Sequence, residues 1–383
     1  MRGVDKHGDC LQQMKTLDDN SVDSIVSDPP YGISFMAKKW DYDVPSVEVW
    51  TEAMRVLKPG GHALIACGTR TQHRMVVNIE DAGFEIRDVV SWIYGSGFPK
   101  SLSISKSIDK QAGVEREVVA ERKGKGRSGG ILGKETESRP PITAPATDAA
   151  KQWDGWGTAL KPSSEFFTLC RKPLSERTIA ANVLKWGTGG INIDGCRVGD
   201  AVNTKRPCGK ALLGTFEGQE GKVSGRDDVG RFPANLIHDG SPEVLELFPE
   251  TKPSKAASRG LQHSGKHGGT CEGGNIKQGT DSVRGHSDNG GSAARFFYQA
   301  KASKKDRNEG CDHLESGNNH ATVKPTALMQ YLCRLITPTG GVVLDPYMGS
   351  GSTGKAALQE GFSFVGIELD PDYYEICKAR VTV

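Results

Sequence analysis

The chain has 383 residues, and its 49 lysines and arginines nearly balance its 47 aspartates and glutamates, so the net charge of +2 indicates no particular partner. Hydrophobic residues make up 36% of the chain and glycine contributes 48 residues, which indicates polar loops around a smaller apolar core. No apolar run reaches the roughly 20 residues of a membrane helix, and the N-terminus lacks the apolar stretch of a signal peptide, so we do not expect a membrane protein.

The nine cysteines form no C-x-x-C pair, and their number is odd. This favours reduced thiols in a cytoplasmic protein over a disulfide framework. One region contains five residues of the types that bind zinc, and the first three have helical spacing, but the glycines around them disfavour a helix. We therefore expect no metal site. The five residues are His263, His267, Cys271, Cys311 and His313.

Strand and helix patterns alternate over the first 95 residues. Ile25 and Val26 end a short buried strand, which Pro29 and Pro30 must stop because neither donates a backbone hydrogen bond. The alternation predicts an α/β sheet. We expect helices at 47–57 and 71–83, strands at 62–67 and 84–94, and a turn at 58–61.

Beyond residue 100 the pattern thins, and 187–318 is the least globular part, with few apolar clusters apart from FPANLI and RFFYQA. Two α/β halves remain, each too small for a sheet of its own. We therefore expect one joint sheet, in which the strand ending at Asp28 lies beside the strand ending at Asp345. The other expected elements are a loop at 120–150, a strand at 164–171, a helix at 175–186 capped by Ser175, a helix at 324–336, a strand, glycine turn and helix at 340–361, a strand at 362–370 and a helix from Pro371.

A glycine-rich turn follows the strand that ends at Asp345. Gly349 and Gly351 allow the backbone to turn tightly and to approach a ligand before the next helix starts. Glu368 ends the following strand, where a carboxylate can accept hydrogen bonds from ribose hydroxyls. A turn without any ligand remains an alternative. A nucleotide-phosphate loop is disfavoured, because Ala356 stands where that motif needs the hydroxyl of Ser or Thr.

The N-terminal motif is Asp28-Pro29-Pro30-Tyr31, directly after a buried strand. The two prolines fix the directions of the backbone carbonyls and of the Asp28 side chain. These acceptors, beside the flat face of Tyr31, suit a planar ring that carries an exocyclic amino group. The motif alone could be a rigid turn, but its place at a strand end, in a chain that also has the glycine motif, favours the binding site.

The segments SDPPYG and LDPYMGSGSTGKAAL together resemble the S-adenosylmethionine-dependent DNA amino-methyltransferases. The catalytic motif precedes the cofactor motif, which is the order of the β class. The resemblance covers 1–195 and 319–383, and phage and prophage adenine methylases are similar in further short segments. These segments are GSGFPKS (95–101), GRFPANLIHDG (230–240), AKASKKDR (300–307) and HATVKP (320–325).

The resemblance implies a Rossmann-like methyltransferase sheet, mixed but mostly parallel, with helices on both faces and a large irregular insert. It divides the chain into a catalytic half (1–195), a target-recognition insert (196–318) and a cofactor-binding half (319–383). It also implies residue roles, although Tyr347-Met348 replaces the family's usual Phe before the first glycine. The catalytic residues would be Asp28, Pro29, Pro30 and Tyr31, and the cofactor residues Asp9, Lys324, Asp345, Gly349, Gly351 and Glu368.

The implied reaction transfers a methyl group from S-adenosylmethionine to N6 of adenine in double-stranded DNA, at specific sites and with the base flipped out of the duplex. Three alternatives remain: cytosine-N4 methylation, because Ser27 precedes Asp28, methylation of a protein glutamine, and a DNA-binding protein without activity. The protein would act in the bacterial cytoplasm, or in that of the host if a phage encodes it. Whether the protein forms a homodimer, and whether it acts together with a cognate restriction nuclease, stays open.

The insert contains a cationic stretch that is not apparent from the small net charge of the whole chain. Residues 251–307 hold 11 lysines and arginines against four acids. We expect this stretch to contact DNA phosphates, with a solvated linker as the alternative. The residues at its end that we assign to DNA binding are Lys301, Lys304, Lys305 and Arg307.

Overall fold

The computed structural model of the chain describes residues 3–381 except 34–40, 98, 100, 123–125, 129–133, 137–139, 203–205, 208–222, 225–228, 254–256, 260–281, 285–288, 302 and 315–316. The chain forms two compact units. The first comprises Met1–Ile93, Glu165–Asn318 and Lys324–Val383, and the second Tyr94–Ser164 and Asn319–Val323. Within the described ranges, no helix is both long and apolar enough to span a bilayer.

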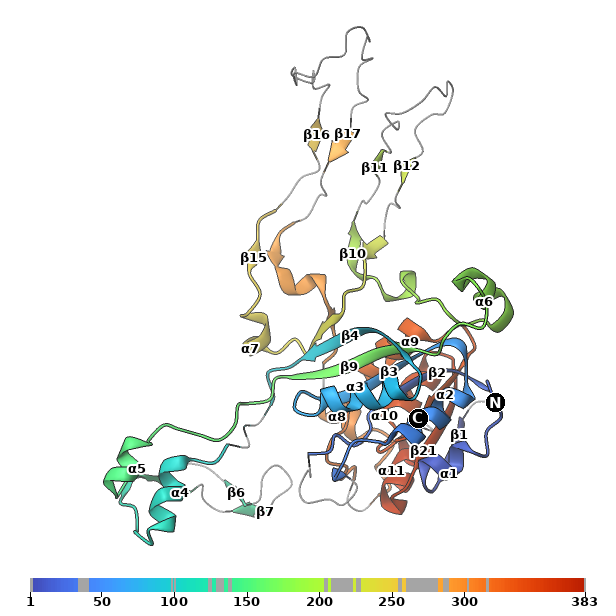
Figure 1. The fold of residues 1–383 in the computed structure, drawn as a ribbon. Coiled ribbons are helices and arrows are strands. Elements are labelled where there is room, and N and C mark those ends of the chain that lie inside the picture. Colours follow the sequence, from blue (N-terminus) through green and yellow to red (C-terminus); the bar gives the residue numbers. More distant parts are fainter. Residues whose placement is uncertain are drawn as a thin grey trace, which may run out of the picture. The chain divides into compact units, whose positions relative to one another are not determined.

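The first unit is built on a nine-stranded sheet with the order β1-β21-β20-β2-β3-β9-β4-β14-β19 (Figure 1). The strands from β1 to β3 in this order run parallel, β9 is antiparallel to β3, and β14 runs parallel to both β4 and β19. The expected mixed, mostly parallel sheet is therefore present. The strands are β1 Gly3–His7, β2 Val22–Ser27, β3 Leu57–Gly68, β4 Glu85–Ile93, β9 Ser164–Arg171, β14 Leu236–His238, β19 Tyr298–Gln299, β20 Val342–Asp345 and β21 Ser363–Glu368.

The two halves of the chain meet at the centre of this sheet. Strand β2 pairs with β20, with Ser24 opposite Val343 and Ile25 opposite Leu344. This confirms the predicted neighbourhood of the strands that end at Asp28 and Asp345. The insert also contributes to the sheet, because its two apolar clusters form β14 and β19, which extend the edge beyond β4.

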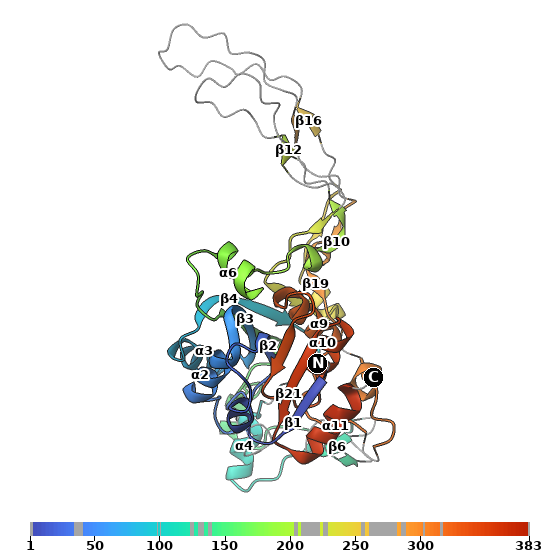
Figure 2. The ribbon, with the colours of Figure 1, turned by 90° about the vertical axis from the view of Figure 1, so that its right-hand side faces the viewer.

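Helices cover both faces of the sheet, as Figure 2 shows, with α2 and α3 on one side and α9, α10 and α11 on the other. Every residue of β2 is buried, as expected for a parallel strand covered on both faces. Trp50 on α2 and Met75 on α3 are fully buried in the core against the sheet. The helices of this unit are α1 Cys10–Met14, α2 Val47–Val56, α3 Gln72–Asp81, α6 Ile179–Trp186, α7 Pro242–Leu245, α8 Lys304–Asn308, α9 Thr326–Ile336, α10 Ser352–Gln359 and α11 Pro371–Val381.

Two local predictions are wrong. Residues 58–61 do not form a turn but continue β3. The register between β2 and β3 is irregular here, because the stretch from Leu57 to His62 faces the shorter stretch from Val22 to Ser24. Gly60, with a positive φ of 77°, accommodates the irregularity. The predicted cap Ser175 does not start α6. That helix begins at Ile179, where the side chain of Thr178 accepts the hydrogen bond of the Ala181 amide.

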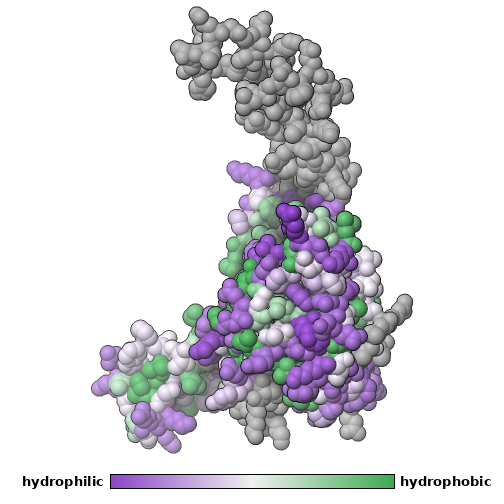
Figure 3. Space-filling view, turned by 45° about the vertical axis from the view of Figure 1, so that its right-hand side comes forward, coloured by the Kyte–Doolittle hydropathy of each residue, from purple (hydrophilic) through white to green (hydrophobic). Residues whose placement is uncertain are grey.

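The second unit packs around a buried carboxylate. Asp109 accepts a 2.7 Å hydrogen bond from Nη1 of Arg116 and 3.0 Å bonds from the amides of Ala146 and Thr147. Part of the predicted loop at 120–150 is therefore ordered. The surface in Figure 3 is mostly hydrophilic, with apolar residues in small patches. The elements of this unit are α4 Ile104–Gln111, β5 Val118–Ala120, β6 Gly126–Ser128, β7 Lys134–Thr136, β8 Ile142–Thr143 and α5 Asp148–Gln152.

Candidate active site

Four carboxylates lie along the side of the sheet that is formed by the carboxyl ends of its parallel strands. The parallel strands β21, β20 and β2 end there, and their last or next residues are Glu368, Asp345 and Asp28. Strand β9 is antiparallel to β3 and pairs Glu165 with Gly68, so it begins on this same side. The sequence predicted the first three acids, and the antiparallel strand adds Glu165.

A buried hydrogen bond joins the two motif-bearing strands. Oγ of Ser27 donates to Oδ1 of Asp345 at 2.6 Å, and the backbone amide of Tyr347 donates to the same oxygen at 3.1 Å. Asp345 is 1% exposed. Burial raises the pKa of this carboxyl group to about 6, although the hydrogen bonds of Ser27 and Thr353 oppose the shift. The D-P-P-Y motif and the glycine turn are thereby held in a fixed relation.

The glycine-rich turn lies against Glu368. The amide of Gly349 donates to Oε2 of Glu368 at 2.7 Å, and the amide of Asp370 donates to Oε1 at 2.8 Å. Gly351 has a φ of 76°, and a Cβ there would lie 3.0 Å from Sγ of Cys377, so the turn needs glycine. Burial raises the pKa of Glu368. Its carboxylate has further acceptor capacity beside the turn, which suits a ligand with neighbouring hydroxyl groups.

The D-P-P-Y motif belongs to a compact group that we call the Asp28 cluster, formed by Asp28, Tyr31, Glu165 and Lys324. Oδ1 of Asp28 accepts from the Tyr31 hydroxyl at 2.7 Å, and Oδ2 accepts from Nζ of Lys324 at 2.6 Å. Oε2 of Glu165 lies 3.1 Å from the Tyr31 hydroxyl and 3.2 Å from Nζ of Lys324. One ammonium is therefore shared between two carboxylates.

Burial and charge fix the protonation states of Lys324 and Tyr31. Burial disfavours the ammonium of Lys324, but the charges of Asp28 and Glu165 outweigh it and raise its pKa. Burial also raises the pKa of Tyr31, and the same two carboxylates add to the shift. Near neutral pH the cluster therefore holds a cationic lysine and a neutral tyrosine.

The backbone of the motif is anchored by residues that we did not predict. Oδ1 of Asp41 accepts from the amides of Tyr31 and Gly32 at 2.7 and 2.9 Å, and Oγ1 of Thr71 donates to the carbonyl of Tyr31 at 2.5 Å. Pro29 is buried. These contacts hold the turn in one conformation, which a rigid catalytic motif requires.

Two predicted cofactor residues make other contacts. The side chain of Asp9 caps α1 by accepting from the amide of Gln12 at 3.0 Å, close to the strand end of Glu368, whose carbonyl accepts from the amide of Gly8. The ammonium of Lys324 lies on Asp28 and Glu165, and also 5.4 Å from the ring centroid of Tyr31. Both cofactor assignments stay predictions.

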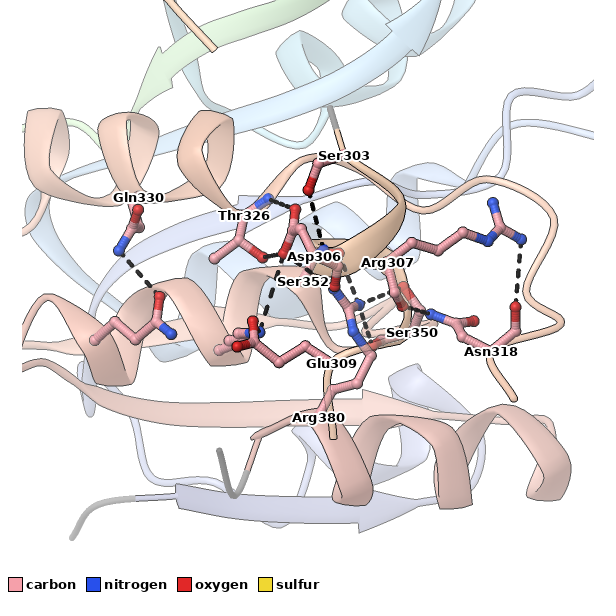
Figure 4. A network of polar contacts seen from close by, with 12 residues as sticks. Ser303, Asp306, Arg307, Glu309, Asn318, Thr326, Gln330, Ser350, Ser352 and Arg380 are labelled. Carbon is pink, nitrogen blue, oxygen red and sulfur yellow. Dashed lines mark hydrogen bonds and ion pairs between the residues drawn. The ribbon is translucent and has the colours of Figure 1, made fainter. Parts of the chain in front are cut away.

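Helix α8 is bound to α9 and α10 by a polar network (Figure 4). Asp306 accepts from the amide and from Oγ1 of Thr326, at 2.9 and 2.5 Å, at the start of α9. Lys355 on α10 is 1% exposed and donates to Oε2 of Glu309 at 2.5 Å. A buried, paired lysine in this position contradicts the nucleotide-phosphate loop, whose lysine must reach the phosphates.

Arg380 extends this network to the glycine turn. Its Nη1 donates to the carbonyl of Ser350 at 2.7 Å and to Oγ of Ser352 at 3.0 Å, and its side chain is fully buried. Oγ of Ser352 in turn donates to the carbonyl of Lys324 at 2.9 Å. The turn, α11 and the Asp28 cluster are thus connected through one guanidinium group.

The predicted DNA-binding residues differ in exposure. Lys301 and Lys305 are exposed, whereas Arg307 is half-buried and donates to the carbonyl of Asn318 at 3.4 Å. Burial lowers the pKa of Arg307. The side chain of Lys304 lies outside the described residues, as do Lys255, Lys266 and Lys277 of the cationic stretch and the zinc candidates His263, His267 and Cys271. The described residues contain no group of three metal-binding side chains.

The glycine turn and the Asp28 cluster lie at adjacent strand ends of a sheet that has the Rossmann-like methyltransferase fold. The chain matches the DNA methylase family over residues 22–121 and 276–379, more than half of its length. It therefore belongs to that family.

Individual relatives match short segments. Type II methyltransferase M.BglI of Bacillus subtilis is 40% identical over 68 residues, which are 18% of this chain and 20% of the relative. DNA adenine methyltransferase YhdJ of Escherichia coli strain K12 is 36% identical over 70 residues, which are 18% of this chain and 24% of the relative. The matches thus span less than a third of these relatives.

Solved structures resemble the whole chain at low identity. The complex of M1.HpyAVI with SAM has a TM-score of 0.42 and 14% identity, covering 100% of both chains. PvuII DNA methyltransferase (cytosine-N4-specific) has a TM-score of 0.47 and 13% identity, covering 99% of this chain and 86% of its own.

Proposed function

We propose that this protein transfers a methyl group from S-adenosylmethionine to N6 of adenine at specific sites in double-stranded DNA. The observation that carries the proposal is the placement of the Asp28 cluster and the glycine turn on adjacent strands, joined by the bond between Ser27 and Asp345. Membership of the DNA methylase family supports it.

The residues at the sheet edge fit the cofactor. The Glu368 carboxylate would accept hydrogen bonds from the ribose hydroxyls of the cofactor, and the turn at Gly349 and Gly351 would let the backbone approach it closely. Asp9 would lie near the adenine ring of the cofactor. When bound, the sulfonium supplies an activated methyl group. The protein's own task is then to position the acceptor more than to supply strong acid or base.

Asp28 would act on the target amine. The exocyclic nitrogen of adenine is a poor nucleophile because its lone pair is delocalised into the ring. The Asp28 carboxylate and the Pro29 carbonyl would accept hydrogen bonds from the two N–H groups of this amine. These bonds would turn the lone pair toward the methyl group. The atom is inaccessible inside a duplex, so the base must be flipped out, and Tyr31 would replace part of the lost stacking.

Adenine is the favoured base because Asp stands directly before Pro-Pro-Tyr. Cytosine-N4 methylation is the second candidate, since Ser27 precedes Asp28 and the same amine chemistry applies. The β-class, phage-like subtype stays a prediction, as do the three-part division at 195 and 318, the cytoplasmic location, a homodimer and a restriction partner.

Transfer of a labelled methyl group to unmethylated DNA, followed by digestion to nucleosides, tests the proposal. Label in N6-methyladenine supports it, and label in N4-methylcytosine supports the second candidate. DNA binding without any transfer would support an inactive DNA-binding protein.

A further inference from the structure

The Asp28 cluster contains one more acid than its lysine needs. Asp28 alone would neutralise Lys324, whose ammonium lies 2.6 Å from Oδ2. Glu165 adds a second negative charge 3.2 Å from the same ammonium, and its side chain is only 19% exposed. With Tyr31 neutral, the formal charges of Asp28, Glu165 and Lys324 sum to −1.

A second acid in a largely buried site is costly for folding. Each partly buried carboxylate loses hydration, and a neutral lysine–aspartate pair would already satisfy the charge of Lys324. An acid that stability does not require, placed beside a proposed catalytic carboxylate, is a candidate for a functional role.

We propose that Glu165 is a positioning residue that sets the charge of the site: by sharing the ammonium of Lys324, it leaves the Asp28 carboxylate able to stabilise positive charge on the target amine. This inference rests on the proposed methyl transfer. Glu165 acts through Lys324 and Tyr31, since those are the cluster members that it contacts.

The charge requirement follows from the bonds that change. The amine lone pair forms the C–N bond as the C–S bond breaks, and the C–S electron pair stays on sulfur, which becomes neutral. Positive charge thus moves to the nitrogen, until the amine releases a proton to solvent. A site with net charge −1 favours this movement, whereas the neutral pair of Asp28 and Lys324 would favour it less.

Charge compensation between two variants tests the proposal. Glu165→Gln retains a hydrogen-bonding side chain but makes the cluster neutral, and Glu165→Gln combined with Lys324→Met restores the net charge of −1. Glu165→Asp keeps the charge on a shorter side chain. Glu176→Gln is the matched control, because Glu176 also pairs with a lysine, Lys185, at 2.6 Å on an exposed surface.

The measurement is the single-turnover rate of labelled methyl transfer to unmethylated DNA, together with the Kd of the cofactor and the Tm. We expect Glu165→Gln to slow transfer about tenfold or more, with the Kd within about twofold and the Tm not lowered. Glu165→Asp should be faster than Glu165→Gln, the double variant should recover part of the lost rate, and the control should match the wild type.

An unchanged rate in Glu165→Gln would overturn the inference. So would a loss of rate accompanied by an equal loss of cofactor affinity or by a lower Tm, since either is the mark of a structural role. A double variant no faster than Glu165→Gln would also overturn it. If the wild type transfers no methyl group to DNA, the proposed function fails, and the inference fails with it.

Discussion

Oγ of Ser27 donates a 2.6 Å hydrogen bond to Oδ1 of Asp345, and both side chains are buried. The bond connects the ends of β2 and β20, the strands that carry the D-P-P-Y motif and the glycine turn. Because Asp28 directly follows Ser27, a shift of either strand would change the distance between Asp28 and the glycine turn. The spacing of the two motifs therefore depends on a buried carboxyl group.

Asp345 makes stability depend on pH. Its pKa is raised from 3.8 to about 6, so between these values the folded chain binds more protons than the unfolded one, and stability falls as pH rises. Asp345→Asn removes this dependence. The unfolding free energy of the wild type minus that of the variant should fall by up to about 3 kcal/mol between pH 4 and pH 6.5. Denaturant titrations measure it, and a difference that stays constant or rises with pH would contradict the assignment.

Asp28→Ala should lower the methyl-transfer rate by at least about 100-fold, as expected for the loss of a group that acts on developing charge. The cofactor Kd should change little, because Asp28 bonds to Lys324, whereas Glu368 bonds to the glycine turn at which we propose that the cofactor binds. Calorimetry and single-turnover kinetics separate the two effects. If Asp28→Ala lost cofactor affinity as completely as activity, Asp28 would belong to the cofactor site and not to the site of the target amine.

Glu368→Ala should weaken cofactor binding by about 1 to 3 kcal/mol, the usual range for a charged hydrogen-bond partner. The variant also releases the amide of Gly349, which adds to the effect. Glu360→Ala is a suitable control, because that acid follows the C-terminus of α10 and pairs with Arg334 on α9. Equal cofactor affinity in the Glu368 and Glu360 variants, measured by calorimetry, would refute the ribose assignment.

Much of this arrangement could be read from the sequence because strand-end motifs must meet for the chemistry to occur. On this ground we expected β2 beside β20, and Glu368 at the end of the strand that follows the glycine motif. Glu165 was not predicted in this way. An acid near the start of a strand lies with the acids at the ends of the parallel strands only if its own strand is antiparallel, and the local sequence pattern does not give strand direction.

Other misses have local physical causes. Pro59 and Gly60 are typical of a turn, but pairing with neighbouring strands carries β3 through them. Strands β14 and β19 have three and two residues, too few for a clear periodicity, and only the existing sheet edge makes them strands. The partner of Lys324 depends on tertiary structure, because 296 positions separate it from Asp28.

Arg380→Met should lower the free energy of unfolding by about 3 to 5 kcal/mol, because it removes a buried charged donor from several acceptors. The carbonyl of Ser350 would lose a bond of 2.7 Å, so the glycine turn should also bind the cofactor more weakly. Chemical denaturation and calorimetry measure the two effects. Lys378→Met, an exposed change on the same helix, is the control. Equal stability of the two variants would contradict the structural role of Arg380.

Lys301→Ala with Lys305→Ala should reduce the salt dependence of DNA binding. Both side chains are exposed, and each lost phosphate contact should shallow the slope of log K against log salt by up to about 0.9. Arg307 is left intact because it contacts Asn318. Binding titrations from 50 to 200 mM salt measure the slope, with Lys185→Ala as the control. A slope equal to that of the wild type would show that these lysines do not contact DNA.

We propose that the Asp28 cluster and the glycine turn together methylate an amino group of adenine in DNA. Wild-type protein and Asp28→Ala should each be incubated with labelled S-adenosylmethionine and unmethylated bacterial DNA, and the digested nucleosides identified by mass spectrometry. We predict labelled N6-methyladenine with the wild type, and with Asp28→Ala at most about one hundredth as much. Label in N4-methylcytosine, equal label from both proteins, or no label from the wild type would show that the Asp28 cluster does not methylate adenine.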